Sequence, residues 1–324
     1  MSIEDQRSPI SAIVVTYFTG PLLARAIESL KAESEIGEII IVDNGNWEGA
    51  VADAVAASPG GAPAEVISGR GNIGFAAACN LGAKQSKGAF LLFLNPDAVL
   101  PKGAAARLLA DGAGLKRPFV LGAKLINPQD GTEQQGSRRA TLTPWRAFVE
   151  ATRLYALAPR HPYFRRFHLH NDPCPNDVAP TATISGACFF LPREDYFAIG
   201  GMDERYFLHV EDIDFCLRFS NAGGTVYFDP HVEVAHFKSS SRVSALRVEL
   251  KKTASINRYF YRHFSDPYPP PFLWLVSGVL WSLFALRAGR RILVRSLALV
   301  GVRARRGDDT ARRARLIASR RAGR

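Results

Sequence analysis

Residues 90–100, with the sequence FLLFLNPDAVL, constrain the fold more than any other segment of the chain. An unbroken apolar run of this length is typical of a buried strand, and Pro96 ends it. The run delivers the carboxylate of Asp97 just past its carboxyl end. Because open α/β sheets bind ligands at that edge, the segment predicts an acidic binding site there. The alternative is an ordinary Asn-Pro-Asp turn.

Strand-like and helix-like segments alternate through the first third of the chain. Strands are predicted at residues 11–16, 38–42, 64–68 and 90–94, and helices at 21–30, 50–57, 72–86 and from about 102. This alternation predicts an α/β fold with a mostly parallel sheet and helices on both faces. Further strands are expected at 120–126 and 225–236, an ordered segment at 181–191, and further helices at 193–199, 211–222 and 244–264. A helix followed by a long loop is expected at 141–180.

The net charge of +11 is confined to one end of the chain. Residues 287–324 hold 13 arginines, no lysine and two aspartates, so the rest of the chain is neutral. A neutral body argues against nucleic-acid binding, and a basic extension favours an anionic partner.

The uncharged residues 272–286 are shorter than the roughly 20 residues of a spanning helix. Together these features predict an interfacial helix on an anionic membrane, and packing on the body or in a homodimer is the alternative.

Cysteine usage and the amino terminus predict the compartment. The four cysteines have no paired metal spacing, and their surroundings predict buried free thiols in a reducing compartment. Residues 1–8 (MSIEDQRS) have no apolar segment of a signal peptide. We therefore expect a cytoplasmic protein, peripheral at the inner face of the membrane.

Polar residues with possible chemical roles stand at the predicted strand ends and helix starts. Asp43 follows an apolar strand and is suited to accept from a nucleobase or ribose, although a turn cap would also explain it. Arg70, Asn72 and Asn80 surround a glycine-rich helix start that is suited to a diphosphate, although tight packing would equally require the glycines. The acids of residues 211–214 (EDID) open a helix, where they also complement its dipole.

Seven blocks in one order carry a family resemblance. They are VVTYF (14–18), IVDNGN (41–46), GNIGFAAACN (71–80), FLLFLNPD (90–97), SGACFFLPR (185–193), GGMDERYFLHVEDIDFCLR (200–218) and VEVAH (232–236). Over about residues 10–240 the chain resembles family 2 inverting glycosyltransferases, in particular the bacterial rhamnosyltransferase-like branch. The resemblance implies a GT-A fold, with a nucleotide-sugar-binding half at about 1–115 and an acceptor half at about 116–266. Residues 267–324 would form an apolar and arginine-rich helical extension.

The resemblance also implies roles for individual residues. Asp212 would be the general base, and Asp97 with His236 would bind Mg²⁺ or Mn²⁺. The donor, a dTDP- or UDP-sugar, would be contacted by Thr16, Tyr17, Asp43, Arg70, Asn72, Asn80, Asn95 and Asp97. Gly186, Ala187, Glu211 and Asp214 are candidates on the side of a glycan or lipid-linked acceptor. Two positions depart from the family pattern: Asn95-Pro96-Asp97 leaves one carboxylate for the cation, and Asn46 with Glu48 replaces the usual serine and acid.

The resulting hypothesis is an inverting, metal-dependent transfer of a sugar, with rhamnose the candidate from the branch, in cell-envelope polysaccharide synthesis. In such a reaction a carboxylate takes the proton of the acceptor hydroxyl as that hydroxyl attacks the sugar. The alternatives are another nucleotide-sugar enzyme and a degenerate module that only binds a nucleotide or glycan. Glu211 and Asp212 together with His236 disfavour the first, and the joint presence of Asp97, Asp212 and His236 disfavours the second.

Overall fold

The structure is a computed structural model that describes residues 9–158, 161–238 and 244–294. The chain divides into two compact units, Met1–Val276 and Ser277–Arg324. Residues 1–8 and ten of the 13 arginines of the tail lie outside the described residues.

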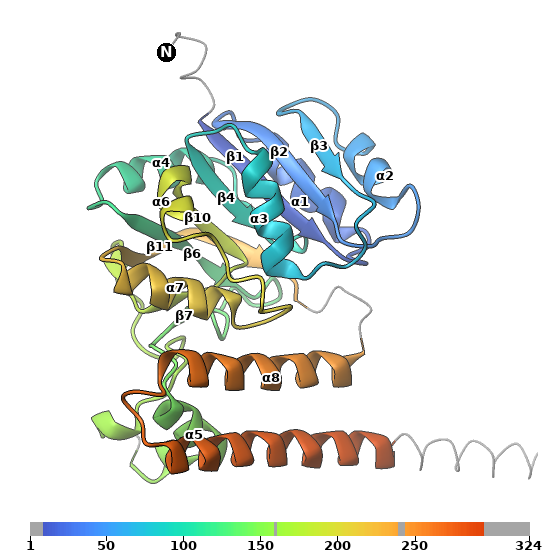
Figure 1. Cartoon of the computed structure of the whole chain (residues 1–324). Helices are drawn as coiled ribbons and strands as arrows, with labels where there is room; N and C mark the ends of the chain where they lie inside the picture. The colour runs from blue at the N-terminus through green and yellow to red at the C-terminus, as the bar shows by residue number, and fades with distance from the viewer. Residues whose placement is uncertain (1–8, 159–160, 239–243, 295–324) are drawn as a thin grey trace, which may run out of the picture. The chain divides into compact units, whose positions relative to one another are not determined.

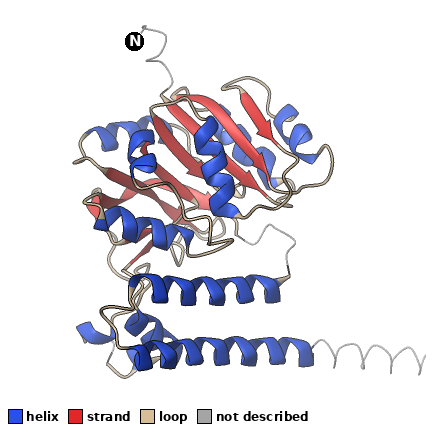
Figure 2. Cartoon of the chain, in the orientation of Figure 1, coloured by secondary structure: helices blue, strands red, loops and turns tan. Residues whose placement is uncertain are grey.

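One sheet forms the centre of the first unit (Figures 1 and 2). Its strands are β1 (Ile10–Thr16), β2 (Ile36–Asp43), β3 (Ala64–Ile67), β4 (Phe90–Leu94), β5 (Ala98–Val99), β6 (Phe119–Ile126), β8 (Ala179–Pro180), β10 (Cys188–Pro192) and β11 (Thr225–His236). Their order is β3-β2-β1-β4-β10-β6-β11-β5, and β8 pairs with β11 off this path. Two short strands, β7 (Arg138–Arg139) and β9 (Thr183–Ile184), form a separate pair.

Helices cover both faces of the sheet, as the alternating pattern predicts (Figure 1). The helices of this unit are α1 (Leu22–Lys31), α2 (Ala50–Ala56), α3 (Phe75–Gln85), α4 (Ala104–Ala113), α5 (Pro144–Thr152), α6 (Arg193–Ala198), α7 (Glu211–Asn221) and α8 (Ala245–His263). Successive strand residues face opposite sides, so Ala12 and Val14 pack with α1, α2 and α4, whereas Ile13 and Val15 pack with α3, α6 and α7.

The strand β10 runs antiparallel between β4 and β6, whereas β1, β2, β3 and β4 are parallel to one another and β6 is parallel to β11. Because β10 runs opposite to β4 and β6, it begins at the edge of the sheet where those two strands end. Gly186 and Ala187, which precede β10, therefore lie at the carboxyl edge of the sheet. The amide of Asn95 donates to the carbonyl of Ala187 there, at 2.9 Å.

Within this unit one expected segment is divided and one expectation needs correction. The ordered segment at 181–191 forms two strands, β9 and β10, because the backbone between them bonds elsewhere. The amide of Ser185 donates to the carbonyl of Ser137, and the amide of Gly186 donates to the Asp212 carboxylate. The prediction of four buried thiols is wrong for Cys174, which is exposed, while the other three cysteines are buried.

Among the described residues, the helix Pro270–Val294 is long and apolar enough to cross a membrane by length and composition alone. The apolar run of residues 272–286 is too short to span, but the helix continues past it through Arg287, Arg290 and Arg291. Counted over the whole helix, the length permits a span, and the interfacial position expected from residues 272–286 stays a prediction.

Candidate active site

The pairing of β5 with β11 brings an acidic turn and a histidine together at the carboxyl edge of the sheet. His236 pairs with Ala98, the residue after Asp97, and the amide of Phe237 donates to the carbonyl of Asp97. The Asp97 carboxylate oxygen Oδ1 lies 3.3 Å from His236 Nε2, and Asn95 Nδ2 lies 3.3 Å from the same nitrogen. Both the Asp97 and His236 side chains are buried.

Gln134 determines which ring nitrogen of a neutral His236 carries the proton. The Gln134 amide nitrogen donates to the carbonyls of His236, at 2.5 Å, and Ile126, at 3.2 Å, so its oxygen Oε1 faces His236 Nδ1 at 3.0 Å. In a neutral imidazole Nδ1 then carries the proton, and the lone pair of Nε2 points toward Asn95 and Asp97. A carboxylate oxygen and an imidazole lone pair on one side are the donor set of a divalent cation, with the ring held by a second residue.

A short run of backbone connects Asp97 and His236 to the acidic cluster of α7. Asn95 bonds to Ala187, as described above, and the amide of the adjacent Gly186 donates to Asp212 Oδ2 at 3.1 Å. The α-carbon of Gly186 also lies close to Asp212, since an added β-carbon would meet the Asp212 β-carbon at 3.4 Å. The predicted cation site and the predicted base are therefore two ends of one site.

Asp212 is paired with an arginine that the sequence did not reveal. Arg139 Nη2 donates to Asp212 Oδ2 at 2.6 Å and to the carbonyl of Ile184 at 2.6 Å. Burial tends to raise the pKa of Asp212, but the charge and hydrogen bond of Arg139, with the amides of Gly186 and Ile213, lower it below its usual value. Asp212 is therefore ionised at neutral pH, the state that a proton acceptor requires.

The neighbouring acid Glu211 behaves in the opposite way. Burial, followed by the negative charge of Asp212, raises the pKa of Glu211 to about 8. Its oxygen Oε2 is buried and has no hydrogen-bond partner in the described part of the chain. Glu211 also helps burial raise the pKa of Cys79, so its carboxyl lies toward α3.

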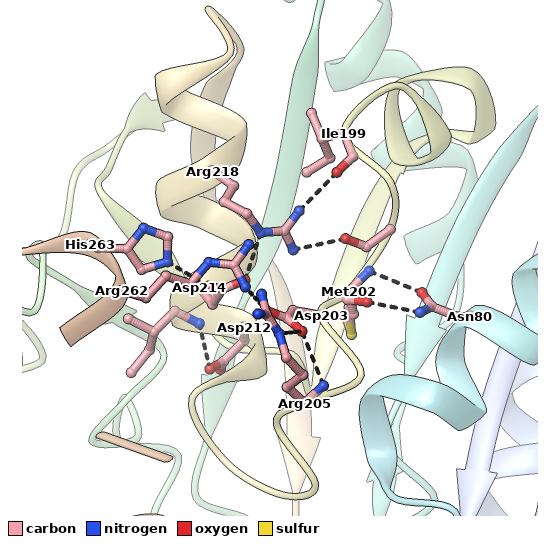
Figure 3. Close-up of polar contacts among 12 residues, drawn as sticks. Asn80, Ile199, Met202, Asp203, Arg205, Asp212, Asp214, Arg218, Arg262 and His263 are labelled. Carbon is pink, nitrogen blue, oxygen red and sulfur yellow. Dashed lines mark hydrogen bonds and ion pairs between the residues drawn. The ribbon is translucent and has the colours of Figure 1, made fainter. Parts of the chain in front are cut away.

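Asp214, the third acid of the cluster, faces α8 (Figure 3). Its fully buried carboxylate accepts from Arg218 Nε and pairs with His263 Nε2, each at 2.7 Å. Arg218 also donates to the carbonyls of Ile199 and Gly201. These contacts give Asp214 a structural role between α7 and α8, and its role toward an acceptor stays a prediction.

The predicted donor residues at the ends of β1 and β2 form one hydrogen-bonded turn. Asp43 Oδ1 accepts from the backbone amides of Gly45 and Asn46 and from the Asn46 side chain. Asn46 also donates to the carbonyl of Thr16. Asp43 thus caps the turn, which is the alternative that the sequence offered for this residue. In the described part of the chain its second oxygen, Oδ2, accepts no hydrogen bond.

Three aromatic side chains adjoin this turn. Tyr17 and Phe18 have ring centroids 4.7 Å apart, and Phe18 and Trp47 have centroids 4.8 Å apart. Trp47 is 57% exposed, which is unusual for so large an apolar group. An exposed indole beside a carboxylate is suited to a flat heterocycle that carries N–H donors.

The glycine-rich start of α3 contains the remaining donor candidates. Asn72 Oδ1 accepts from the amide of Gly74, and Arg70 is exposed in the same loop. Gly74 has φ +91°, and an added β-carbon would lie 2.9 Å from the carbonyl oxygen of Phe207, so close packing explains this glycine. That carbonyl accepts from the amide of Phe75, which joins the loop to the segment before α7.

Asn80 has a full set of protein partners. Its oxygen accepts from the Met202 amide and its nitrogen donates to the Met202 carbonyl (Figure 3). The oxygen also accepts from the Tyr196 hydroxyl, at 2.5 Å, and the nitrogen also donates to Glu204. The side chain is buried. These bonds give Asn80 a structural role, and its contact with a donor stays a prediction.

Arg139, Gln134 and Trp47 are the residues that sequence reasoning missed. Arg139 and Gln134 lie between the strand predicted at 120–126 and the segment 141–180, where the sequence has no periodicity, so no pattern pointed to them. A buried pairing of Arg139 with an acid of another element is invisible without the fold. Trp47 had one usable signal, its position four residues after Asp43.

Comparisons with known proteins identify the family of the chain. The model of glycosyl transferase family 2 matches residues 11–184. An N-acetylglucosaminyl-diphospho-decaprenol L-rhamnosyltransferase of Mycobacterium tuberculosis is 28% identical over 306 residues, 89% of this chain and 93% of that protein. The O-antigen biosynthesis protein RfbC of Myxococcus xanthus is 26% identical over 243 residues, 72% of this chain and 18% of that protein.

A solved structure, GalNAc-T7 with UDP, GalNAc and Mn²⁺, has a similar fold with a TM-score of 0.54 and 16% identity. The likeness covers 79% of this chain and 48% of that one, so this chain spans about half of its length. The predicted GT-A arrangement is thereby confirmed at the level of the fold. Since the family model matches more than half of the chain, this protein belongs to glycosyl transferase family 2 and is a glycosyltransferase of the rhamnosyltransferase-like kind.

Proposed function

We propose that the enzyme transfers rhamnose or a closely related sugar, with inversion, from a dTDP- or UDP-sugar to a hydroxyl of a lipid-linked sugar. The observation that carries this proposal is the continuous contact from His236 and Asp97, through Asn95, Ala187 and Gly186, to Asp212. The names of the Mycobacterium and Myxococcus relatives support a lipid-diphosphate acceptor and a role in cell-envelope polysaccharide synthesis.

The donor nucleotide would lie at the ends of β1 and β2. Asp43 Oδ2 would accept from the base or ribose, Thr16 and Tyr17 would line the same edge, and Trp47 would stack on the base. Arg70 and Asn72, at the start of α3, would face the diphosphate, where an arginine and backbone amides suit an anion.

A divalent cation, Mg²⁺ or Mn²⁺, would be held by Asp97 and His236. The donor set fits, because Gln134 directs the Nε2 lone pair toward the Asp97 carboxylate. Among the residues that the structure describes, no group of three histidine, cysteine or acidic side chains surrounds a common point. Two protein ligands are sufficient for a cation whose other ligands are phosphate oxygens and water. The cation would offset the charge that develops on the departing nucleoside diphosphate.

Asp212 would take the proton from the acceptor hydroxyl as that hydroxyl attacks the anomeric carbon. A single displacement of this kind inverts the anomeric centre and requires no covalent sugar–enzyme intermediate. Arg139 and Gly186 hold the carboxylate ionised and oriented. Glu211, whose pKa is raised to about 8, is mostly protonated at neutral pH and is the weaker candidate for the base.

The test is sugar transfer by the purified enzyme with dTDP-rhamnose and a panel of UDP-sugars, using N-acetylglucosamine on a short-chain prenyl diphosphate as acceptor. Asp212→Asn should lower kcat by about 10²- to 10⁴-fold, the usual contribution of a general base, while donor binding is kept. The matched control is Asp53→Asn, on an exposed position of α2, which should retain full activity. Near-normal turnover in Asp212→Asn would exclude this residue as the base, and no transfer from any donor would exclude the proposed reaction.

A further inference from the structure

The acceptor side of the site contains nitrogen atoms that the proposed reaction does not use. Arg139 Nε, His168 Nδ1 and His170 Nδ1 are buried, and none has a hydrogen-bond partner within the described ranges. Buried polar atoms are nearly always paired, so a cluster of three such nitrogens calls for an explanation, such as a ligand.

The backbone pairing of Arg139 with His168 places the side chains that carry these nitrogens close together. Arg139 and His168 form an antiparallel bridge, so their side chains project to the same side. His170, two residues further on, has its ring centroid 6.2 Å from that of His168. Arg139 itself bonds to Asp212 at 2.6 Å. The histidines therefore adjoin the residue that contacts the proposed base.

Positive charge surrounds this group. Burial, then the charges of Arg139, His170 and Lys252, lower the pKa of His168 to about 3. Burial, then the charge of Lys252, lower the pKa of His209 to about 4. Lys252 belongs to α8, so a second element contributes to the same electrostatic field. Both histidines are neutral at physiological pH and each keeps one N–H donor.

We propose that Arg139, His168, His170 and Lys252 form a subsite for the phosphate that is attached to the acceptor sugar. This acceptor-phosphate subsite rests on the proposed function, since it assigns the acceptor of that same reaction. A phosphate on the anomeric carbon lies one sugar ring from a reacting ring hydroxyl. Arg139 is placed to serve both groups, because it contacts Asp212 and belongs to the nitrogen cluster.

The donor phosphates have a different place in this arrangement. They would lie with Asp97 and His236, and Gly186 and Ala187 separate that end of the site from Asp212. The acceptor-phosphate subsite lies beyond Asp212, on the side of Arg139. Two anionic groups can thus bind at once without sharing ligands.

The experiment compares two acceptors in the full-length enzyme with one donor. The charged acceptor is N-acetylglucosamine on a short-chain prenyl diphosphate, and the neutral acceptor is octyl N-acetylglucosaminide. The measured quantity is the ratio of kcat/KM for the charged acceptor to that for the neutral one. Lys252→Gln and His168→Gln should each lower this ratio about tenfold, as expected for a lost contact to a charged group. Arg258→Gln, an exposed arginine of α8, is the matched control and should keep the ratio of the unmodified enzyme.

The outcomes separate this inference from the proposed function. Equal kcat/KM for the two acceptors in the unmodified enzyme, or an equal loss for both acceptors in each variant, overturns the acceptor-phosphate subsite and leaves the transferase reaction standing. A changed ratio in Arg258→Gln would equally count against it, because the effect would then be one of general surface charge. If neither acceptor is glycosylated, the proposed function fails and the subsite fails with it.

Discussion

Asp212 and Glu211 are neighbours in the chain, yet their surroundings shift their pKa values in opposite directions. Burial opposes ionisation of both, but Asp212 has Arg139 and two backbone amides, whereas at Glu211 burial and the negative charge of Asp212 outweigh the favourable effects of a backbone hydrogen bond and of Arg139. The sequence could nominate the pair as a cluster. The difference between the two acids arises from the hydrogen bonds that Asp212 accepts from Arg139 and from two backbone amides, and Arg139 comes from another part of the chain.

Arg139 should therefore set the pH dependence of transfer. In Arg139→Gln, burial is no longer offset and the pKa of Asp212 rises, so the acidic limb of kcat/KM should move to higher pH. The measurement is a pH profile of transfer. In Arg139→Lys the positive charge is kept, so the acidic limb should lie closer to that of the unmodified enzyme than in Arg139→Gln. A profile that falls uniformly at every pH, with no displaced limb, would assign Arg139 a purely structural role.

At the scale of elements, the site depends on strands that begin or end at the same edge. Asp97 follows β4, His236 ends β11, and Gly186 precedes β10. The parallel β4 could be placed from its apolar run and its terminal turn. The antiparallel insertion of β10 beside it could not, because periodicity gives strand positions but not the order or direction of pairing.

The junction of β5 and β11 should control cation-supported donor binding. Asp97→Ala removes the carboxylate that faces His236 Nε2, and donor affinity in Mn²⁺ should fall roughly 10- to 100-fold, as expected for a lost charge-assisted contact. Calorimetry with a nucleoside diphosphate, with and without Mn²⁺, measures this effect. Asp53→Ala is the control and should bind normally. Equal affinities in Asp97→Ala and the unmodified enzyme would count against a role for Asp97 at the cation.

At the scale of the whole molecule, the helix Pro270–Val294 combines two features of membrane-active segments. Trp274 and Trp281 are exposed on it, and Arg287, Arg290 and Arg291 follow the apolar part. We propose that this helix holds the enzyme at an anionic cytoplasmic membrane surface, where a lipid-linked acceptor would be located. Whether the helix spans or lies in the interface depends on how the arginines are accommodated, since its length permits both.

Binding to anionic vesicles should have a salt-sensitive and a salt-resistant part. Changing Arg287, Arg290 and Arg291 to glutamine should weaken binding about fivefold for each arginine at low salt and less at high salt, because salt screens surface charge. The double variant Trp274→Ser and Trp281→Ser should weaken it at both. Co-sedimentation with anionic and neutral vesicles measures these effects. A protein that ignores vesicles and instead dimerises through this segment would support the packing alternative. Resistance to extraction at alkaline pH would indicate a spanning helix.

The sequence by itself determined the class of fold and the identity of the main acids. Strand and helix periodicity, the apolar run before Asn95-Pro96-Asp97 and the order of the seven blocks are local features, readable without knowing what lies beside them. The tertiary structure alone decided which of these residues meet: Asp97 with His236, Asn95 with Ala187, Gly186 with Asp212, and Asp214 with His263. It also decided the partner of the proposed base Asp212, which is Arg139. The reason is physical, because the pKa of a buried acid and the ligands of a cation depend on distances between atoms from separate elements, and sequence spacing does not fix those distances.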